Sequence, residues 1–194
     1  MSTSEIAVAF ATVAELEARL RRMADTPSDE GPGITELDHG LQCAAELKAL
    51  APDDVALQLA GLVHDIGHGM GHIRDHAWTG AEAVRPLLGN RIAELIGLHI
   101  DAKRYLVTTD AAYRSSLSQT SIDTLALQGG EMAADEVARF EGWTHWRAAL
   151  DLRRADEAAK TPGRDVPGLE TWLPALRAAA RPNTHTLQEP SHGA

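Results

Sequence analysis

Cysteine, aromatic residues and positive charge are all scarce in this sequence. Cys43 is the only cysteine among 194 residues, so no disulfide can form within the chain and we expect a reducing compartment. Aromatic side chains make up 4% of the chain, against 44% for all hydrophobic residues. The core is therefore expected to consist mainly of Leu, Ala, Val and Ile. The formal net charge of −10 argues against general electrostatic binding to nucleic acid or to an anionic membrane.

Long apolar runs are also absent. No stretch approaches the roughly 20 apolar residues that span a membrane. The chain does not open with a basic segment followed by an apolar run, which is the pattern of a signal peptide. We therefore expect a cytoplasmic protein without a membrane partner.

The apolar residues recur at the spacing of helices. Leu16, Leu20 and Met23 show this period, and no segment sustains the alternation that is typical of a half-buried strand. A chain of this length is long enough for one domain with a full core. We predict an all-α fold in a single domain that covers residues 1–194.

Proline, glycine and polar clusters divide the chain into predicted helices. These helices cover residues 4–23, 35–50, 55–65, 75–88, 91–101, 118–127, 133–140, 143–160 and 169–180. Thr3 or Ser4 is expected to cap the first helix, and the Pro- and Gly-rich residues 26–33 are expected to form a loop. We expect the core of the domain within about residues 35–175 and a disordered tail at 181–194.

Histidine and aspartate residues that suit metal binding are spread along these helices. The adjacent pair His64 and Asp65 precedes a Gly-rich segment, which would expose both side chains at the end of a helix. In such a pair the carboxylate can bridge two ions while the imidazole binds one. Imidazole and carboxylate ligands suit Zn, Mn or Fe, and six ligands exceed the need of one ion, so we predict a two-metal site. The six are His39, His64, Asp65, His76, His99 and Asp156.

Spacing alone leaves some of these assignments open. Asp151, Asp156 and Glu157 belong to one charged helix, and their positions do not distinguish which of them is the ligand. His72 lies one turn before the predicted ligand His76. It is either a loop residue without a role in the site or an additional polar group beside it. Cys43 lies one turn after the predicted ligand His39. A small buried side chain is a simpler interpretation of Cys43 than a seventh ligand.

A polar stripe supplies candidate substrate contacts. Ser121, Thr124 and Gln128 recur at helical spacing within an otherwise apolar helix. A buried polar stripe needs hydrogen-bond partners, and a polar ligand would be one such partner. The alternative is that the stripe is an exposed helix face.

Several of these segments resemble a known family. His39, the His64-Asp65-Ile-Gly-His68 segment and Asp156 resemble the HD-domain superfamily of metal-dependent helical proteins, and the added histidines resemble its two-metal branch. More specific are His99-Ile-Asp-Ala-Lys103-Arg-Tyr-Leu, Leu117-Ser-x-x-Ser121-x-x-Thr124-Leu-x-Leu-Gln128-Gly-Gly and Leu152-Arg-Arg-x-Asp156-x-x-Ala-Lys160-x-Pro-Gly. These three segments resemble the phosphonate-degrading HD oxygenases, which belong to the mixed-valence di-iron oxygenases.

The resemblance implies an HD-domain helical bundle with a metal site at its centre. It implies that one iron is held by His39, His64, Asp65 and Asp156. It implies that the other is held by His76 and His99, with Asp65 bridging. The implied catalytic residues are Asp65, His68 and Lys103. The implied substrate-binding residues are His68, Lys103, Ser121, Thr124 and Gln128.

The implied reaction uses two iron ions in mixed valence and dioxygen as co-substrate. It oxidises the carbon that bears the hydroxyl and phosphonate groups of a 1-hydroxy-phosphonate, cleaves the C–P bond and releases phosphate. A 2-amino- or substituted-aminoethylphosphonate type of substrate is expected. One alternative is a metal-dependent HD phosphohydrolase that acts on a nucleotide or phosphate ester. Another is a non-catalytic binding module with a vestigial site.

One stretch departs from the family pattern. Members that act on the aminoethyl compound carry a tyrosine and a glutamate upstream of the first histidine ligand. Here the stretch reads Asp29-Glu30-Gly31-Pro32-Gly33, in which the tyrosine has no counterpart and Pro32 takes the place of the glutamate. The exact phosphonate is therefore open, with Asp29 or Glu30 as a candidate contact for a cationic group and a solvated loop as the alternative.

Overall fold

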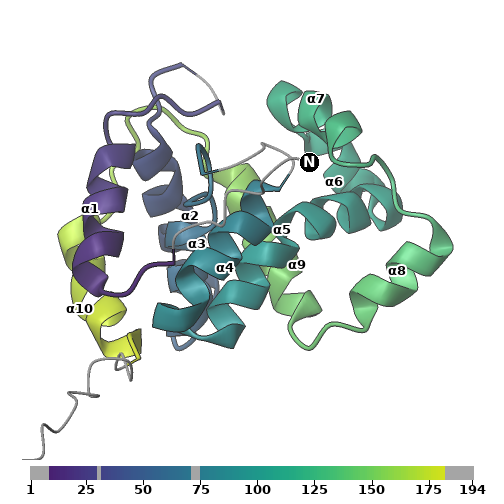
Figure 1. Cartoon of the computed structure of the whole chain (residues 1–194). Coiled ribbons are helices and arrows are strands. Elements are labelled where there is room, and N and C mark those ends of the chain that lie inside the picture. The colour runs from purple at the N-terminus through teal and green to yellow at the C-terminus, as the bar shows by residue number, and fades with distance from the viewer. Residues whose placement is uncertain (1–8, 30–31, 71–74, 182–194) are drawn as a thin grey trace, which may run out of the picture.

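The computed structural model describes residues 9–29, 32–70 and 75–181 of the chain. Within these ranges ten helices form the fold, and the only β-type pairing is an isolated bridge between Pro27 and Thr35. The predicted all-α class is confirmed. The helices are α1 (Val13–Met23), α2 (Glu36–Leu50), α3 (Val55–Val63), α4 (His76–Leu88), α5 (Asn90–Thr109), α6 (Ala111–Ser116), α7 (Gln119–Leu127), α8 (Ala134–Glu141), α9 (Trp146–Ala158) and α10 (Leu169–Ala179) (Figure 1).

The start of α1 differs from the prediction. The helix begins at Val13 rather than near residue 4, because Thr12 forms a capping box with Glu15. The Thr12 hydroxyl accepts from the backbone N–H of Glu15 at 3.2 Å, and the Glu15 carboxylate accepts from the backbone N–H of Thr12 at 3.3 Å. This pairing satisfies backbone donors that the helix start leaves open. The predicted caps Thr3 and Ser4 lie outside the described residues, as does the tail at 182–194.

The end of α5 is the second difference. This helix runs to Thr109, eight residues beyond the predicted end at residue 101, and α6 was not predicted at all. Asp110 both ends α5 and caps α6, since its carboxylate accepts from the backbone N–H groups of Ala112 and Tyr113, each at 3.1 Å. The remaining predicted helices are confirmed to within three residues at either end.

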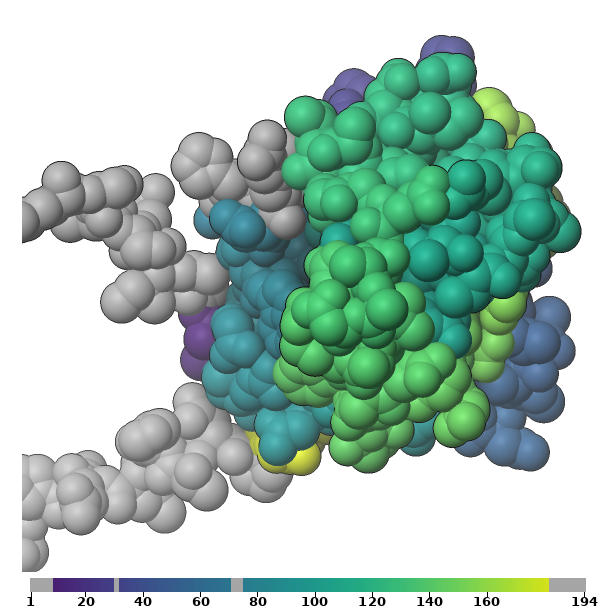
Figure 2. Space-filling view, turned by 90° about the vertical axis from the view of Figure 1, so that its right-hand side faces the viewer, coloured from purple at the N-terminus to yellow at the C-terminus, as the bar shows by residue number. Residues whose placement is uncertain are grey.

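Helix α5 lies in the middle of the bundle. It packs against α3, α4 and α9, while α2 packs against α3 and α9. The core between them consists mainly of Leu, Ala, Ile and Val, as the low aromatic content indicates. Helices α6, α7 and α8 lie together on the side opposite α1 and α10 (Figure 1). In the space-filling view the green segments that include α7 and α8 occupy much of the face that is shown (Figure 2).

Two glycines allow close approach where the predicted ligands lie. A Cβ atom at Gly40 on α2 would lie 2.5 Å from the carbonyl oxygen of Leu62 on α3. A Cβ atom at Gly67 would lie 2.1 Å from the carbonyl oxygen of His76 on α4. Both distances are far below van der Waals contact, so only glycine fits without movement of the neighbouring backbone. No described helix is both long and apolar enough to cross a membrane.

Candidate metal centre

Four of the predicted ligands come together at the centre of the bundle. His39 lies on α2, His64 and Asp65 follow α3, and Asp156 lies on α9. Nε2 of His39 lies 3.2 Å from Oδ1 of Asp156 and 3.6 Å from Oδ2 of Asp65. Nε2 of His64 lies 3.2 Å from Oδ2 of Asp65 and 3.8 Å from Oδ1 of Asp156. Ligand atoms about 2.1 Å from one ion lie roughly 3–4 Å apart, depending on the angle between them at the ion, so these four atoms, the first cluster, suit a single ion.

The other three ligand atoms form a second cluster on the opposite side of Asp65. Oδ1 of Asp65 lies 3.3 Å from Nε2 of His76 on α4 and 3.7 Å from Nε2 of His99 on α5. The two Nε2 atoms are 3.1 Å apart. Asp65 therefore directs Oδ2 toward the first cluster and Oδ1 toward the second, as a carboxylate that bridges two ions does.

Backbone carbonyls fix three of the imidazole rings. The Nδ1–H groups of His39, His64 and His99 each donate a hydrogen bond of 2.8 Å. The acceptors are the carbonyl oxygens of Ala159, Gly61 and Ile96. A carbonyl oxygen accepts only, so Nδ1 carries a proton and Nε2 is the ring atom that faces the cluster. At His39 and His64 burial lowers the pKa, but the neighbouring carboxylates outweigh it and raise the pKa above its usual value, so a metal ion would have to displace the Nε2 proton of these two rings.

The burial of these atoms supports a metal. His39 and His64 have 0% exposure, and among the described residues their Nε2 atoms have no hydrogen-bond partner of suitable geometry. Buried polar atoms without a partner are costly, and a cation at the first cluster would satisfy both. Four imidazoles and two carboxylates form a donor set that fits Zn, Mn or Fe.

The electrostatics favour the metal-binding forms of the carboxylates. Burial raises the pKa of Asp65, but the neighbouring histidines His64, His68 and His76 together outweigh it and hold the pKa well below its usual range. For Asp156 burial also raises the pKa, but Arg153, His39 and His64 together lower it to well below the ordinary value. Burial and nearby imidazoles keep the pKa of His99 well below the usual value for histidine. Both aspartates are thus ionised and His99 is neutral near pH 7.

A cavity of about 50 Å³ adjoins the second cluster. Four of the five predicted substrate-binding residues line it, namely His68, Lys103, Thr124 and Gln128. The other lining residues are Asp29, Asp65, His76, His99, Ile100, Thr120, Arg153 and Asp156. Lys103 is only 4% exposed, and its ammonium donates to the hydroxyl of Thr124 at 2.8 Å. Oε1 of Gln128 is buried and has no hydrogen-bond partner within the part of the chain that the structure describes.

Ser121 is the predicted substrate residue that does not line this cavity. Its hydroxyl donates to Oε2 of Glu157 at 2.7 Å and accepts from Arg153 and Lys160, each at 2.9 Å. Because Ser121 is 1% exposed, the alternative of an exposed face is wrong at this position. The helical period predicted a shared face, but it did not predict which residues α7 would meet.

His68 is held by two residues that the sequence did not identify. The Arg19 guanidinium donates to the carbonyl oxygens of His68 and, at 3.5 Å, Ile66. The buried Glu36 places Oε1 3.7 Å from Nδ1 of His68. Burial lowers the pKa of His68, but Asp65 and Glu36 outweigh it and raise the pKa to about 9. Glu36 opens α2 and reads in the sequence as an ordinary acidic residue of a first turn, so no pattern marked it.

The structure also decides among the open alternatives. Of the three acidic candidates on α9, Asp156 faces the first cluster, Glu157 bonds to Ser121, and Asp151 pairs weakly with Arg154 at 3.9 Å. Cys43 is buried in the apolar core, and burial raises the pKa of its thiol to about 12. His72 and Glu30 lie outside the described residues.

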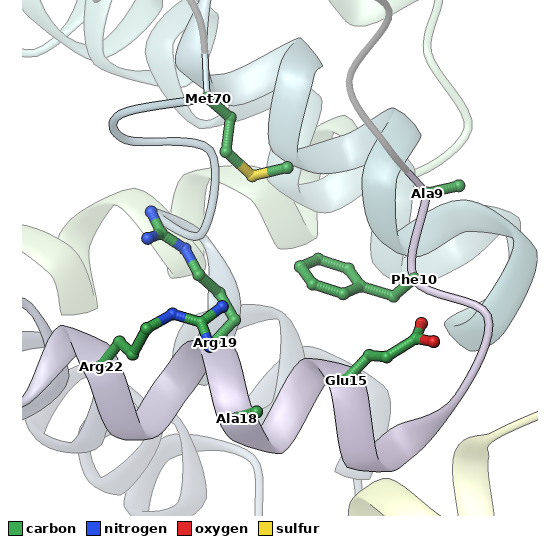
Figure 3. A pocket seen from close by; sticks show the side chains of 7 residues that line it. All are labelled: Ala9, Phe10, Glu15, Ala18, Arg19, Arg22 and Met70. Carbon is green, nitrogen blue, oxygen red and sulfur yellow. The ribbon is translucent and has the colours of Figure 1, made fainter.

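A larger hollow of about 400 Å³ lies beside α1 and is separate from these clusters. Phe10 and Met70 give it apolar walls, and Arg19 and Arg22 border it from α1 (Figure 3). Glu15 is the only side chain of metal-ligand type among the described residues that line it. The candidate site is therefore the smaller cavity beside the second cluster.

Comparison with known proteins gives the family. The HD domain model matches residues 37–137. The chain belongs to the HD-domain family. This HD protein is 37% identical over 150 residues to a hydroxymethylphosphonate dioxygenase of Gimesia maris, which covers 72% of this chain and 74% of the relative.

A second relative carries a related name. It is the glycine-betaine-forming [1-hydroxy-2-(trimethylamino)ethyl]phosphonate dioxygenase of Leisingera caerulea, 33% identical over 158 residues, or 76% of this chain and 80% of the relative. The predicted resemblance to HD oxygenases that act on phosphonates is thereby confirmed at the level of the family.

Proposed function

We propose that this HD protein is a dioxygen-dependent di-iron oxygenase that cleaves the C–P bond of a 1-hydroxy-phosphonate and releases phosphate. The observation that carries the proposal is the position of Asp65, whose two carboxylate oxygens face two separate clusters of imidazole and carboxylate ligands. The names of the two relatives add the reaction class, because both are phosphonate dioxygenases.

The proposed iron ligands follow the two clusters. His39, His64, Asp65 and Asp156 would hold one iron, and Asp65, His76 and His99 would hold the other. Four and three protein ligands leave open positions on six-coordinate ions, where substrate and dioxygen can bind. When bound, a mixed-valence iron pair would supply the oxidising chemistry with dioxygen that side chains alone lack.

The cavity beside the second cluster suits a phosphonate. Lys103 offers a buried ammonium that is oriented by Thr124, and charge-assisted hydrogen bonds to oxyanions are the stronger kind. Gln128 provides an amide and His68 a ring nitrogen among the residues that line the same cavity. Ser121 would reach the substrate only by releasing one of its present partners on α9 or Lys160.

These residues would act by binding and orientation. A phosphonate fixed by Lys103, Thr124 and Gln128 would have its hydroxyl-bearing carbon directed toward the second cluster. Such fixed geometry converts an encounter between reactants into an intramolecular step. The small volume of the cavity, about 50 Å³, would limit the water that accompanies the substrate.

The substituent on the hydroxyl-bearing carbon is the least defined part of the substrate. The names of the two relatives share a carbon with both a hydroxyl and a phosphonate, and they differ in whether a trimethylamino group follows. We propose a 2-amino- or substituted-aminoethyl type. Asp29 supports a cationic substituent, because it is an exposed carboxylate among the residues that line the cavity.

The experiment that tests this function combines iron loading with oxygen measurement. Protein loaded with Fe(II) without oxygen should, on exposure to oxygen, give a mixed-valence EPR signal, consume dioxygen and release phosphate from a panel of 1-hydroxy-phosphonates. The panel includes hydroxymethylphosphonate and its amino- and trimethylaminoethyl relatives. Hydrolysis of phosphate esters with manganese, together with no oxygen consumption on any phosphonate, would instead establish the phosphohydrolase alternative.

A further inference from the structure

Arg153 is a buried cation that has no role in the assignments above. It lies on α9, one turn before Asp156, and is 3% exposed. Its Nη1 donates to Oδ2 of Asp156, and its Nη2 donates to Oε2 of Glu157. The same Nη2 donates to the hydroxyl of Ser121 at 2.9 Å, and Nε donates to the hydroxyl of Tyr113 at 2.7 Å. One guanidinium therefore joins side chains of α6, α7 and α9.

Because of the contact with Arg153, the two carboxylate oxygens of Asp156 have different partners. Oδ2 is bonded to Arg153, whereas Oδ1 lies 3.2 Å from Nε2 of His39 and 3.8 Å from Nε2 of His64. A free carboxylate can rotate about its side-chain bonds, whereas one held at a single oxygen presents the other oxygen in a fixed direction. The planar, always charged guanidinium suits this task better than an ammonium.

The contacts on the other side hold α7 in place. The Ser121 hydroxyl and the backbone N–H of Ser118 each donate to Glu157 at 2.7 Å. The Lys160 ammonium donates to Glu157 and to Ser118, each at 3.0 Å. This network, formed by Arg153, Glu157, Lys160, Ser118 and Ser121, fixes the start of the helix that carries Thr124 on the cavity wall.

We infer that Arg153 is a positioning residue that holds Asp156 with one oxygen toward the first cluster and ties that ligand to α7. The inference rests on the proposed function in one respect, since it takes Asp156 as a metal ligand. Arg153 would act through Asp156 and not on the reacting atoms. Groups that orient a metal ligand in this way typically contribute about 10- to 100-fold in metal affinity.

Two variants separate positioning from charge. Arg153→Lys keeps the positive charge, but one ammonium cannot replace the planar set of donors that reaches Asp156, Glu157 and Tyr113. The double variant Arg153→Met/Glu157→Gln preserves the net charge and leaves no unpaired carboxylate at position 157. The matched control is Arg154→Lys, since Arg154 is the adjacent residue and its side chain is 49% exposed.

Metal affinity is the deciding measurement. The full-length chain is titrated with Fe(II) in the absence of oxygen against a competing chelator, and bound metal is counted by elemental analysis. Both Arg153 variants should bind one of two ions about 10- to 100-fold more weakly, while Arg154→Lys keeps wild-type affinity for both. Unchanged affinity in both Arg153 variants would overturn the inference.

A general loss of stability needs its own control. Leu16→Ala removes a fully buried core side chain of α1, a helix that carries none of the six predicted ligands, and it should lower the melting temperature without changing metal affinity. An equal loss of affinity in Leu16→Ala would show that the effect of Arg153 is only structural, which contradicts the inference. If neither Arg153 variant folds, Tyr113→Phe is the deciding variant, because it removes one hydrogen-bond partner of Arg153. A several-fold loss of affinity for one of the two metal ions would support the inference. Wild-type affinity for both ions would contradict it.

The two proposals can fail separately. Weakened metal binding in the Arg153 variants of a protein that cleaves no phosphonate would refute the proposed function and support the role of Arg153. If the wild-type protein cleaves a phosphonate but the Arg153 variants bind both ions with normal affinity, the proposed function is supported and the role of Arg153 is refuted.

Discussion

Replacement of Lys103 by methionine tests the proposed phosphonate cavity most directly. The Lys103 side chain is 4% exposed, and its ammonium lies 2.8 Å from the Thr124 hydroxyl at the cavity wall. Methionine keeps the length of the apolar stem and therefore much of its packing, while it removes the charge and all three N–H donors. The change is thus confined to the group that is proposed to bind the phosphonate.

The size of the effect follows from the kind of contact that is lost. A hydrogen bond to a charged group contributes about 1.5–3 kcal/mol. With 1.4 kcal/mol for each factor of ten, Lys103→Met should raise KM roughly 10- to 150-fold. The maximal rate kcat should change much less, because the contact binds the phosphonate in the ground state and in the transition state alike.

Steady-state phosphate release across substrate concentrations gives both constants. Lys48→Met is the matched control, since it makes the same change in net charge at a lysine of α2 that packs over the Trp172 ring, with its ammonium 5.6 Å from the ring centre. A KM of Lys103→Met equal to that of the control would refute the role of Lys103 in substrate binding. A loss confined to kcat would instead place Lys103 in the chemical step.

Three further predictions concern the metals and the fold. His99→Ala should reduce bound metal from two ions to one and abolish turnover, with His145→Ala as control; elemental analysis that still finds two ions would contradict the second cluster. Gly67→Ala should destabilise the protein by about 3 kcal/mol or more, because the new Cβ would lie 2.1 Å from the His76 carbonyl oxygen. Denaturant unfolding measures this loss of unfolding free energy. A loss under about 1 kcal/mol would show that the backbone moves to accommodate the methyl group. Thr12→Ala should cost about 1 kcal/mol of unfolding free energy with unchanged activity, and a normal melting temperature would mean that the capping box does not hold α1.

The six residues that the structure brings together in the two clusters could be predicted because residue type and order carry most of that information. An adjacent His-Asp pair at a helix end, with other histidines on separate helices, leaves few alternative interpretations once the family pattern is considered. The choice of Asp156 could not be made from spacing. Asp156 and Glu157 are neighbours and point about 100° apart on α9, so only the position of the surrounding helices decides which one meets His39.

The sequence patterns could not predict which residues of different helices contact one another. The period of Ser121, Thr124 and Gln128 indicated a common face, yet Ser121 meets α9 while Thr124 meets Lys103 on α5. Likewise, Arg153 lies in a charged run that is typical of a solvated helix face, and its burial follows from its contacts with α6 and α7. Helix α6 was not predicted, so neither was the partner that Tyr113 provides.

The proposed substrate is an anion, although the chain carries a net charge of −10. Arg153 does little to resolve this conflict, because Asp156 and Glu157 neutralise it locally. Two divalent ions would retain about two positive charges after the carboxylates of Asp65 and Asp156 are counted, and a mixed-valence iron pair about three. The metals, with Lys103, would then provide most of the attraction for a phosphonate, since the charges of the distant surface are screened beyond about 8 Å. A phosphohydrolase with the same ligands would attract phosphate esters by the same charges. Anion binding therefore does not distinguish the two functions, whereas a requirement for dioxygen does.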